Sequence, residues 1–276
     1  MGVNGSVMFR EPLPVMLVHG WNSHPGIWNR LVLHLSGASI PYWKFDHSGM
    51  TGSDIAELAI ALDNSITDMR NDSGYTGPID IVSHSVGTCI TRYLLEVVDG
   101  TAQDQKVRRL IGLGPPNNGS ALAELFHDPL KGGEVINRLT GVFLKPGFDP
   151  SADAIVQDVR PGSPVMLALR SAGIRPDITY RIIVTGNPGG RSDFFPQFGG
   201  KTWEIATDGG WQQTYEGDGI VPHRESRLPG ISLDIVSLDP DDAALSLPPG
   251  QYGHINLPKN PVVIERIMRY LTQTTS

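Results

Sequence analysis

Short apolar runs alternate with longer amphipathic segments along most of the chain. The apolar runs have the length of strands and occupy residues 14–19, 42–46, 79–83, 107–113, 180–184 and 233–238. Continuous runs of this kind are typical of strands that are buried on both faces, as in parallel sheets. Since helical segments separate most of them, the pattern predicts an α/β fold with a mostly parallel sheet flanked by helices.

The helical segments carry apolar residues at helical spacing and have recognisable ends. One expected helix includes Ile27 and stops at Gly37. Others run over 54–70 and over 86–98, and a final helix begins at Asn260. Asp54 with Glu57 resembles a capping box. Asn260 followed by a proline is a typical helix start.

Two regions break this alternation. Residues 120–178 contain many Pro and Gly positions, with short helices expected over 121–126 and near 165–170. Residues 186–219 are expected to form a long loop and hold the aromatic residues Phe194, Phe195, Phe198, Trp203 and Trp211. Apolar side chains in loops indicate either a lid over an acyl-chain cleft or ordinary packing of a cap. We expect one domain over residues 1–276 that carries both insertions.

The composition of the chain limits the classes of partner that it can bind. The 276 residues are 39% hydrophobic and 18% charged, with a formal net charge of −7 and no basic cluster, which argues against nucleic acid. The apolar runs are too short to span a membrane, and residues 1–6 do not resemble a signal peptide. The compartment stays open. The single cysteine, Cys89, falls on an apolar helical face, so we expect it in the core.

The chemistry centres on Ser85, between the run 79–83 and the helix 86–98. A serine on a tight strand-to-helix turn presents its hydroxyl above a helix N-terminus with free N–H groups. The sequence Ser83-His84-Ser85-Val86-Gly87 matches the nucleophile elbow G-x-S-x-G except at its first glycine. The alternative is that Ser85 is an ordinary helix cap.

A serine nucleophile needs a base and an orienting carboxylate. His254 follows the last strand, and Asp218 lies between two glycines that let the backbone turn sharply. The order Ser85, Asp218, His254 is the chain order of this architecture. The other candidate bases are His223, His19, His24 and His47, and the other candidate acids are Asp208, Asp193, Asp239, Asp241 and Asp242.

The chain resembles the α/β-hydrolase family, and within it bacterial lipases and esterases. The resemblance rests on five ordered segments, which are 18–21, 83–87, 114–120, 217–222 and 253–254. It implies that Ser85 is the nucleophile, Asp218 the acid and His254 the base, with the backbone N–H groups of Trp21 and Val86 as the oxyanion hole. The chain departs from the family at Ser83 and in Gly-Pro-Pro-Asn-Asn-Gly-Ser at 114–120. His84 is expected to make a structural hydrogen bond, and His19 to brace the oxyanion loop.

The resemblance implies a serine carboxylic ester hydrolase of the carboxylesterase or triacylglycerol lipase type, which works through an acyl-enzyme. Its substrate would be a small-molecule ester or a lipid. Transient contact of the protein with a lipid interface stays open, and no transmembrane segment is expected. No cofactor or metal is expected, because the acidic residues 239–242 are typical of a solvated turn more than of a calcium site. An acyltransferase or thioesterase on the same triad stays open, as does a non-catalytic binding module of this fold.

Overall fold

The computed structural model describes residues 12–237 and 247–273. Six parallel strands form one sheet in the order β2-β1-β3-β4-β5-β8. They are β1 (Val15–Val18), β2 (Tyr42–Phe45), β3 (Ile79–His84), β4 (Val107–Leu113), β5 (Thr179–Gly186) and β8 (Leu233–Ser237). The six strands expected from the sequence are therefore present, and the predicted α/β class with a parallel sheet is confirmed.

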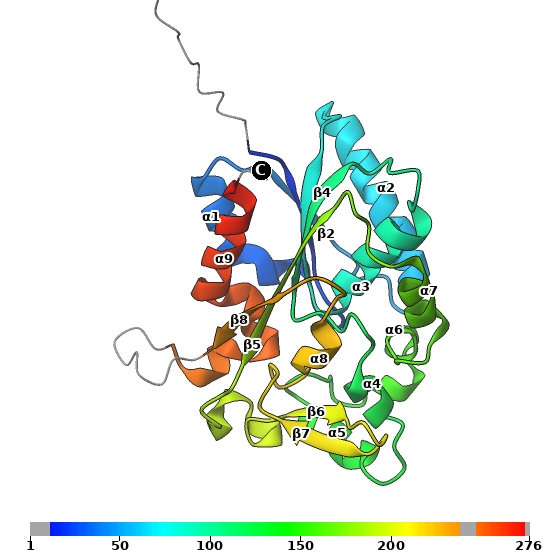
Figure 1. The fold of residues 1–276 in the computed structure, drawn as a ribbon, viewed down its shortest axis with the longest axis vertical. Coiled ribbons are helices and arrows are strands. Elements are labelled where there is room, and N and C mark those ends of the chain that lie inside the picture. The colour runs from blue at the N-terminus through cyan, green and yellow to red at the C-terminus, as the bar shows by residue number, and fades with distance from the viewer. Residues whose placement is uncertain (1–11, 238–246, 274–276) are drawn as a thin grey trace, which may run out of the picture.

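Helices cover both faces of this sheet (Figure 1). On one face lie α1 (Asn29–Gly37) and α9 (Pro261–Thr272), and on the other lie α2 (Ile55–Ser73), α3 (Val86–Arg92) and α7 (Pro164–Ala172). Both expected caps are present. Asp54 and Glu57 form a reciprocal capping box, and the Asn260 side chain accepts from the first turn of α9. The helix expected over 86–98 continues beyond α3 as a π-helix, Tyr93–Val98.

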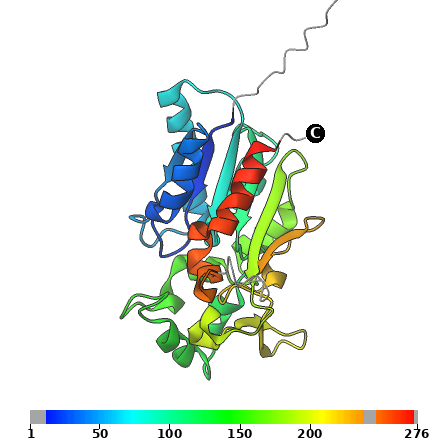
Figure 2. The same ribbon diagram turned by 90° about the vertical axis from the view of Figure 1, so that its left-hand side faces the viewer.

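The irregular region 120–178 holds more helix than expected. It contains α4 (Ala121–Leu125), α5 (Gly132–Leu139), a 3-10 turn (Pro150–Ala152), α6 (Ala154–Asp158) and α7. We call residues 120–159 the cap segment. Its helices α4 and α5 lie beyond the carboxyl ends of the strands, at the lower end of both views (Figures 1 and 2). The cap segment thus lies at the end of the sheet where ligands of α/β proteins bind.

The prediction of a loop over 186–219 is wrong in part. This region forms 3-10 turns at Ser192–Phe194 and Pro196–Phe198 and an antiparallel hairpin of β6 (Thr202–Ile205) and β7 (Trp211–Thr214). The hairpin strands are half polar and lie outside the main sheet, so they make no continuous apolar run. The hairpin turn contains Asp208-Gly209, a typical hairpin signal that could have identified it.

The core forms where helices pack against the sheet. Cys89 is fully buried there, and burial raises the pKa of its thiol to about 12. The thiolate is therefore disfavoured, in line with the prediction that Cys89 is a core residue.

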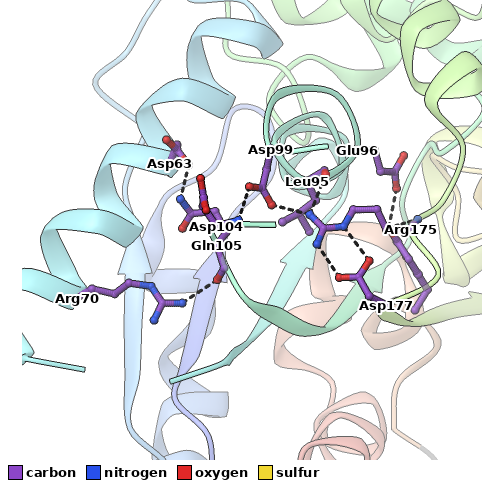
Figure 3. Close-up of polar contacts among 10 residues, drawn as sticks. Asp63, Arg70, Leu95, Glu96, Asp99, Asp104, Gln105, Arg175 and Asp177 are labelled. Carbon is purple, nitrogen blue, oxygen red and sulfur yellow. Dashed lines mark hydrogen bonds and ion pairs between the residues drawn. The ribbon is translucent and has the colours of Figure 1, made fainter. Parts of the chain in front are cut away.

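Figure 3 shows an ion-pair network around Arg175 and Asp177, two residues that precede the amino end of β5. The Arg175 guanidinium donates to Asp99 Oδ2 at 2.5 Å, to Asp177 Oδ2 at 2.6 Å and to the Leu95 carbonyl oxygen at 3.2 Å. Arg175 and Asp99 are both buried. Removing one partner of such a buried pair leaves an uncompensated charge, which costs about 3–5 kcal/mol. The network therefore ties the end of the π-helix to the start of β5, and its role is structural.

Candidate active site

Ser85 occupies a strained turn between β3 and α3. Its backbone has φ 55° and ψ −131°, a conformation that a residue with a Cβ rarely adopts. The Ser85 N–H donates to the carbonyl oxygen of Leu113 at 2.9 Å, which holds the turn against β4. Ser85 makes no side-chain cap hydrogen bond to α3. The alternative of an ordinary helix cap therefore has no support, because the hydroxyl is directed away from the helix N–H groups.

Close packing around the turn explains its small residues. A Cβ on Gly87 would lie 2.3 Å from the carbonyl oxygen of His19, and one on Gly20 would lie 2.9 Å from Ser85 Cβ. Ser83 takes the position of the first elbow glycine. Its buried hydroxyl lies 2.8 Å from Thr88 Oγ1, so the two side chains pair across the turn between β3 and α3. Thr88 therefore supplies a hydrogen-bond partner for Ser83, the serine that replaces the first glycine of the motif.

Three sequence-predicted residues form one hydrogen-bonded chain. Ser85 Oγ lies 2.9 Å from His254 Nε2, and His254 Nδ1 lies 2.7 Å from Asp218 Oδ2. Since the carboxylate can only accept, Nδ1 carries the proton and Nε2 is free to accept from the serine hydroxyl. Ser85 is 7% exposed, while His254 and Asp218 are each 1% exposed. The arrangement has the geometry of a nucleophile, a base and an orienting carboxylate.

Backbone contacts fix the carboxylate. Asp218 Oδ1 accepts from the N–H groups of Ile220 at 3.0 Å and Val221 at 2.7 Å, which leaves Oδ2 for His254. Gly114, at the end of β4, has φ +54°, and a Cβ there would lie 2.6 Å from Asp218 Oδ2. The carboxylate–imidazole pair therefore needs a glycine beneath it.

Two further histidines stabilise the loop after β1. The rings of His19 and His47 stack with centroids 3.8 Å apart, and His47 Nε2 lies 3.0 Å from the carbonyl oxygen of His19. His19 Nδ1 donates to the carbonyl oxygen of Gly20 at 2.9 Å. Burial lowers the pKa of both, that of His47 to about 4, so they are neutral near pH 7. His19 thus braces this loop, as expected.

Two backbone N–H groups, those of Trp21 and Val86, are the candidate oxyanion donors. The Val86 N–H is the first of α3, and such groups have no acceptor within the helix. Within residues 12–237 and 247–273, neither the Val86 N–H nor the Trp21 N–H donates a hydrogen bond. The Trp21 N–H shares one peptide plane with the Gly20 carbonyl that His19 holds, so His19 sets the direction of this donor.

An apolar cavity of about 40 Å³ opens beside Ser85. Its walls come from the loop after β1, α3, the cap segment and the loop after Asp218. They include Trp21, Val86, Phe126, Phe143, Val156 and Ile220. With its walls in this arrangement, the cavity has room for a few water-sized groups, which is enough for a short acyl chain.

A family model described as the alpha/beta hydrolase fold matches residues 14–132. The chain has the α/β-hydrolase fold. The match covers the loop after β1 and the turn at Ser85 but ends before Asp218 and His254. The hydrogen bonds described above are therefore what links those two residues to Ser85. Comparison with curated proteins gives no match.

Solved structures support the same α/β-hydrolase fold at low identity. The mature lipase BlEst2 of Bacillus licheniformis is 18% identical with a TM-score of 0.65, over 95% of this chain and 93% of that one. The phospholipase PlaB of Legionella pneumophila is 16% identical with a TM-score of 0.66, over 95% of this chain and 60% of that one. The monoacylglycerol lipase of Paleococcus ferrophilus is 14% identical with a TM-score of 0.51, over 94% and 93%.

The other candidate acids and bases lie elsewhere in this hydrolase fold. His223 is buried and donates to the carbonyl oxygen of Thr185, and His24 caps the 3-10 turn Pro25–Trp28. Asp193 pairs with Arg191 at the surface, and Asp208 lies in the β6–β7 turn. Asp239, Asp241 and Asp242, with the proposed acidic turn, lie outside the described residues.

Some residues around the site have no signal in the sequence. Asp153 accepts from the Trp21 indole, and the Phe143 ring packs edge-on to the His254 ring with centroids 6.2 Å apart. Glu225 is buried and accepts from the Ala121 N–H at 2.8 Å, and burial raises its pKa well above the usual value. Each of these contacts joins positions far apart in the chain, which no local sequence pattern reveals.

Two classes of feature are not found in the part of the chain that the structure describes. No group of three or more His, Cys, Asp or Glu side chains there is arranged to hold a metal ion. Over the same residues, no helix is long and apolar enough to cross a membrane.

Proposed function

We propose that the chain is a serine carboxylic ester hydrolase of the lipase or esterase kind. The observation that carries this proposal is the unbroken chain from Ser85 Oγ through His254 to Asp218, with contacts of 2.9 Å and 2.7 Å. The apolar cavity beside Ser85 supports an acyl group as the part of the substrate that is bound. The lipase and phospholipase structures of similar fold point the same way.

The first half-reaction builds an acyl-enzyme. Ser85 Oγ attacks the ester carbonyl carbon while His254 Nε2 takes the hydroxyl proton, and Asp218 stabilises the imidazolium that results. The N–H groups of Trp21 and Val86 bind the oxyanion, where loss of one donor typically lowers turnover about 10²–10³-fold. When the tetrahedral intermediate collapses, His254 gives its proton to the departing alkoxide, which leaves as an alcohol.

The second half-reaction is hydrolysis. A water molecule replaces the alcohol, His254 accepts its proton, and the hydroxide attacks the acyl carbon. Collapse of this second intermediate expels Ser85 Oγ, which regains its proton from His254, and the acid is released. In an acyltransferase an alcohol would take the place of this water, and no contact in the site favours that reaction.

The substrate is a small-molecule ester or a lipid. The cavity of about 40 Å³ favours short acyl chains unless the cap segment moves. Two exposed apolar side chains of the cap segment, Leu130 and Val142, are 90% and 49% exposed, which supports transient contact with a lipid interface.

The test is hydrolysis of p-nitrophenyl esters from acetyl to palmitoyl by the wild type, by Ser85→Ala and by Ser36→Ala. Ser36 is an exposed serine of α1 and serves as the control. The proposal expects hydrolysis by the wild type and by Ser36→Ala, best with short chains, and none above background by Ser85→Ala. Equal turnover in Ser85→Ala would overturn it.

A further inference from the structure

The side chain of Trp21 is held by the cap segment. Its indole Nε1–H donates to Asp153 Oδ1 at 3.1 Å, and its rings pack against those of Phe143 and Phe148 with centroids 5.5 Å and 5.7 Å away. Asp153 comes 132 positions later in the chain, just before α6. The residue that offers a candidate oxyanion donor from its backbone is therefore anchored by its side chain to a different part of the fold.

Asp153 is itself fixed. The same oxygen, Oδ1, accepts from the Val156 N–H at 3.1 Å and so caps α6. Ile155, two positions after Asp153, lines the acyl cavity together with Val156. One carboxylate thus sets the start of the helix that forms a cavity wall and also holds Trp21, which lines the same cavity.

The residue after Trp21 has a second tie to the cap segment. Asn22 has φ 50°, a left-handed conformation that Asn adopts more readily than most residues with a side chain, and its Nδ2 donates to the Phe143 carbonyl oxygen at 2.9 Å. On the other side of the loop, His19 holds the Gly20 carbonyl. The peptide that carries the Trp21 N–H is therefore held from both ends, by His19 on the sheet side and by Asp153 on the cap side.

We propose that Asp153 is a positioning residue for the oxyanion hole. By holding the Trp21 indole, Asp153 aligns the Trp21 backbone N–H, so the alignment of the hole depends on the position of the cap segment. This inference rests on the proposed ester hydrolysis. Oxyanion stabilisation requires donors at hydrogen-bond distance from the developing charge, so a small shift of the Trp21 backbone reduces turnover. A cap segment that is displaced releases Trp21 and leaves the hole incomplete, which couples substrate enclosure to catalytic competence.

The test compares kcat and KM for a short-chain p-nitrophenyl ester in four single variants and one double variant. Asp153→Ala removes the acceptor, Asp153→Asn keeps an acceptor oxygen, and Trp21→Phe keeps ring packing without the indole donor. The control is Asp149→Ala, because Asp149 caps the neighbouring turn Pro150–Ala152 of the same segment and is not hydrogen-bonded to Trp21.

We expect Asp153→Ala and Trp21→Phe to lower kcat about 10- to 100-fold, with KM changed less than threefold. Asp153→Asn should recover most of the loss, and Asp149→Ala should stay within twofold of the wild type. The double variant Trp21→Phe/Asp153→Ala should be no slower than the worse single variant, because both remove one interaction.

A transition-state mimic supplies the decisive readout. A trifluoromethyl ketone with the same acyl group adds to the serine as an oxyanion, so its affinity should fall in parallel with kcat in both single variants. Unchanged kcat in Trp21→Phe, additive losses in the double variant, or an equal loss in Asp149→Ala would each overturn the positioning role while the wild type still hydrolyses esters. A wild type without Ser85-dependent hydrolysis would overturn the proposed function, and the positioning role with it.

Discussion

His84 Nε2 donates a hydrogen bond to the carbonyl oxygen of His254, 3.0 Å away. The residue before the candidate nucleophile therefore holds the backbone of the candidate base. Burial, together with the nearby His254, lowers the pKa of His84 well below its usual value, so its ring is neutral near pH 7 and Nε2 keeps the proton that this bond needs. The contact joins positions 170 residues apart.

Removing this donor should slow catalysis. His84→Phe keeps a ring in the buried site but cannot donate to the His254 carbonyl, so the imidazole loses part of its alignment with Ser85. We expect kcat to fall about 10- to 100-fold, since small misplacements of catalytic groups have effects of that size. His84→Gln offers an N–H of similar reach and should recover part of the loss. Steady-state kinetics on a short-chain ester measures both, and full activity in His84→Phe would show that the brace is unimportant.

Gly114 should tolerate no side chain. Gly114→Ala would place a Cβ 2.6 Å from Asp218 Oδ2 and 3.2 Å from His254 Nδ1, which forces the pair apart. We expect a loss of turnover of about 10²-fold or more. The control is Gly74→Ala, where φ is +67° and a Cβ would have nothing within 4 Å. It carries the same kind of backbone strain, so equal activity losses in the two variants would contradict a specific role for the space above Gly114.

Much of the fold could be predicted from the sequence because buried strands and amphipathic helices leave periodic patterns. The six strands and the capped helices carry such patterns, whereas the β6–β7 hairpin is half polar and was expected as a loop. Ser85 and His254 could be selected because they follow recognisable strands, and Asp218 because it lies between two glycines. Asp153 and Glu225 could not, since their importance comes from contacts across the fold, and their local sequences are typical of solvated surface turns.

Because of Glu225, the free energy of unfolding should decrease as the pH rises above the acid range. Burial raises its pKa well above the usual value, and its Oε2 has no hydrogen-bond partner in the part of the chain that the structure describes. A folded-state pKa above the unfolded value means that stability is fully present below the unfolded pKa and falls as pH rises through the folded one. Glu225→Gln keeps an acceptor for the Ala121 N–H and cannot ionise.

Urea unfolding measures this effect. Relative to the wild type, Glu225→Gln should gain free energy of unfolding as the pH rises from about 5 to about 9, with little difference at the acid end. Glu265→Gln, an exposed position on α9, serves as the control and should show no such trend. A constant difference across this range would mean that Glu225 is ionised or solvated at all of these pH values.

The buried histidines should act in the opposite direction. The pKa of His47 is lowered to about 4, chiefly by burial, and the pKa values of His19 and His84 are lowered too. A depressed pKa gives stability that is present above the unfolded value and is lost as pH falls through the folded value. For His47, the free energy of unfolding should therefore fall between about pH 6.5 and about pH 4, by up to about 1.4 kcal/mol per pH unit, and His19 and His84 should act in the same direction.

Urea unfolding of His47→Gln tests this slope against His34→Gln, an exposed histidine of α1. The His47 variant should depend less steeply on pH in the acid range, while the His34 variant should follow the wild type. Parallel curves for wild type and His47→Gln would contradict the depressed pKa.

The central claim is that Ser85 is the nucleophile, and a fluorophosphonate probe tests it most directly. Folded protein is treated with the probe, and intact mass followed by peptide mapping locates the adduct. The account predicts one adduct per chain, on Ser85, with none in Ser85→Ala and strongly slowed labelling when His254 is replaced by Ala. An unlabelled wild type, or an adduct on another serine, would contradict it.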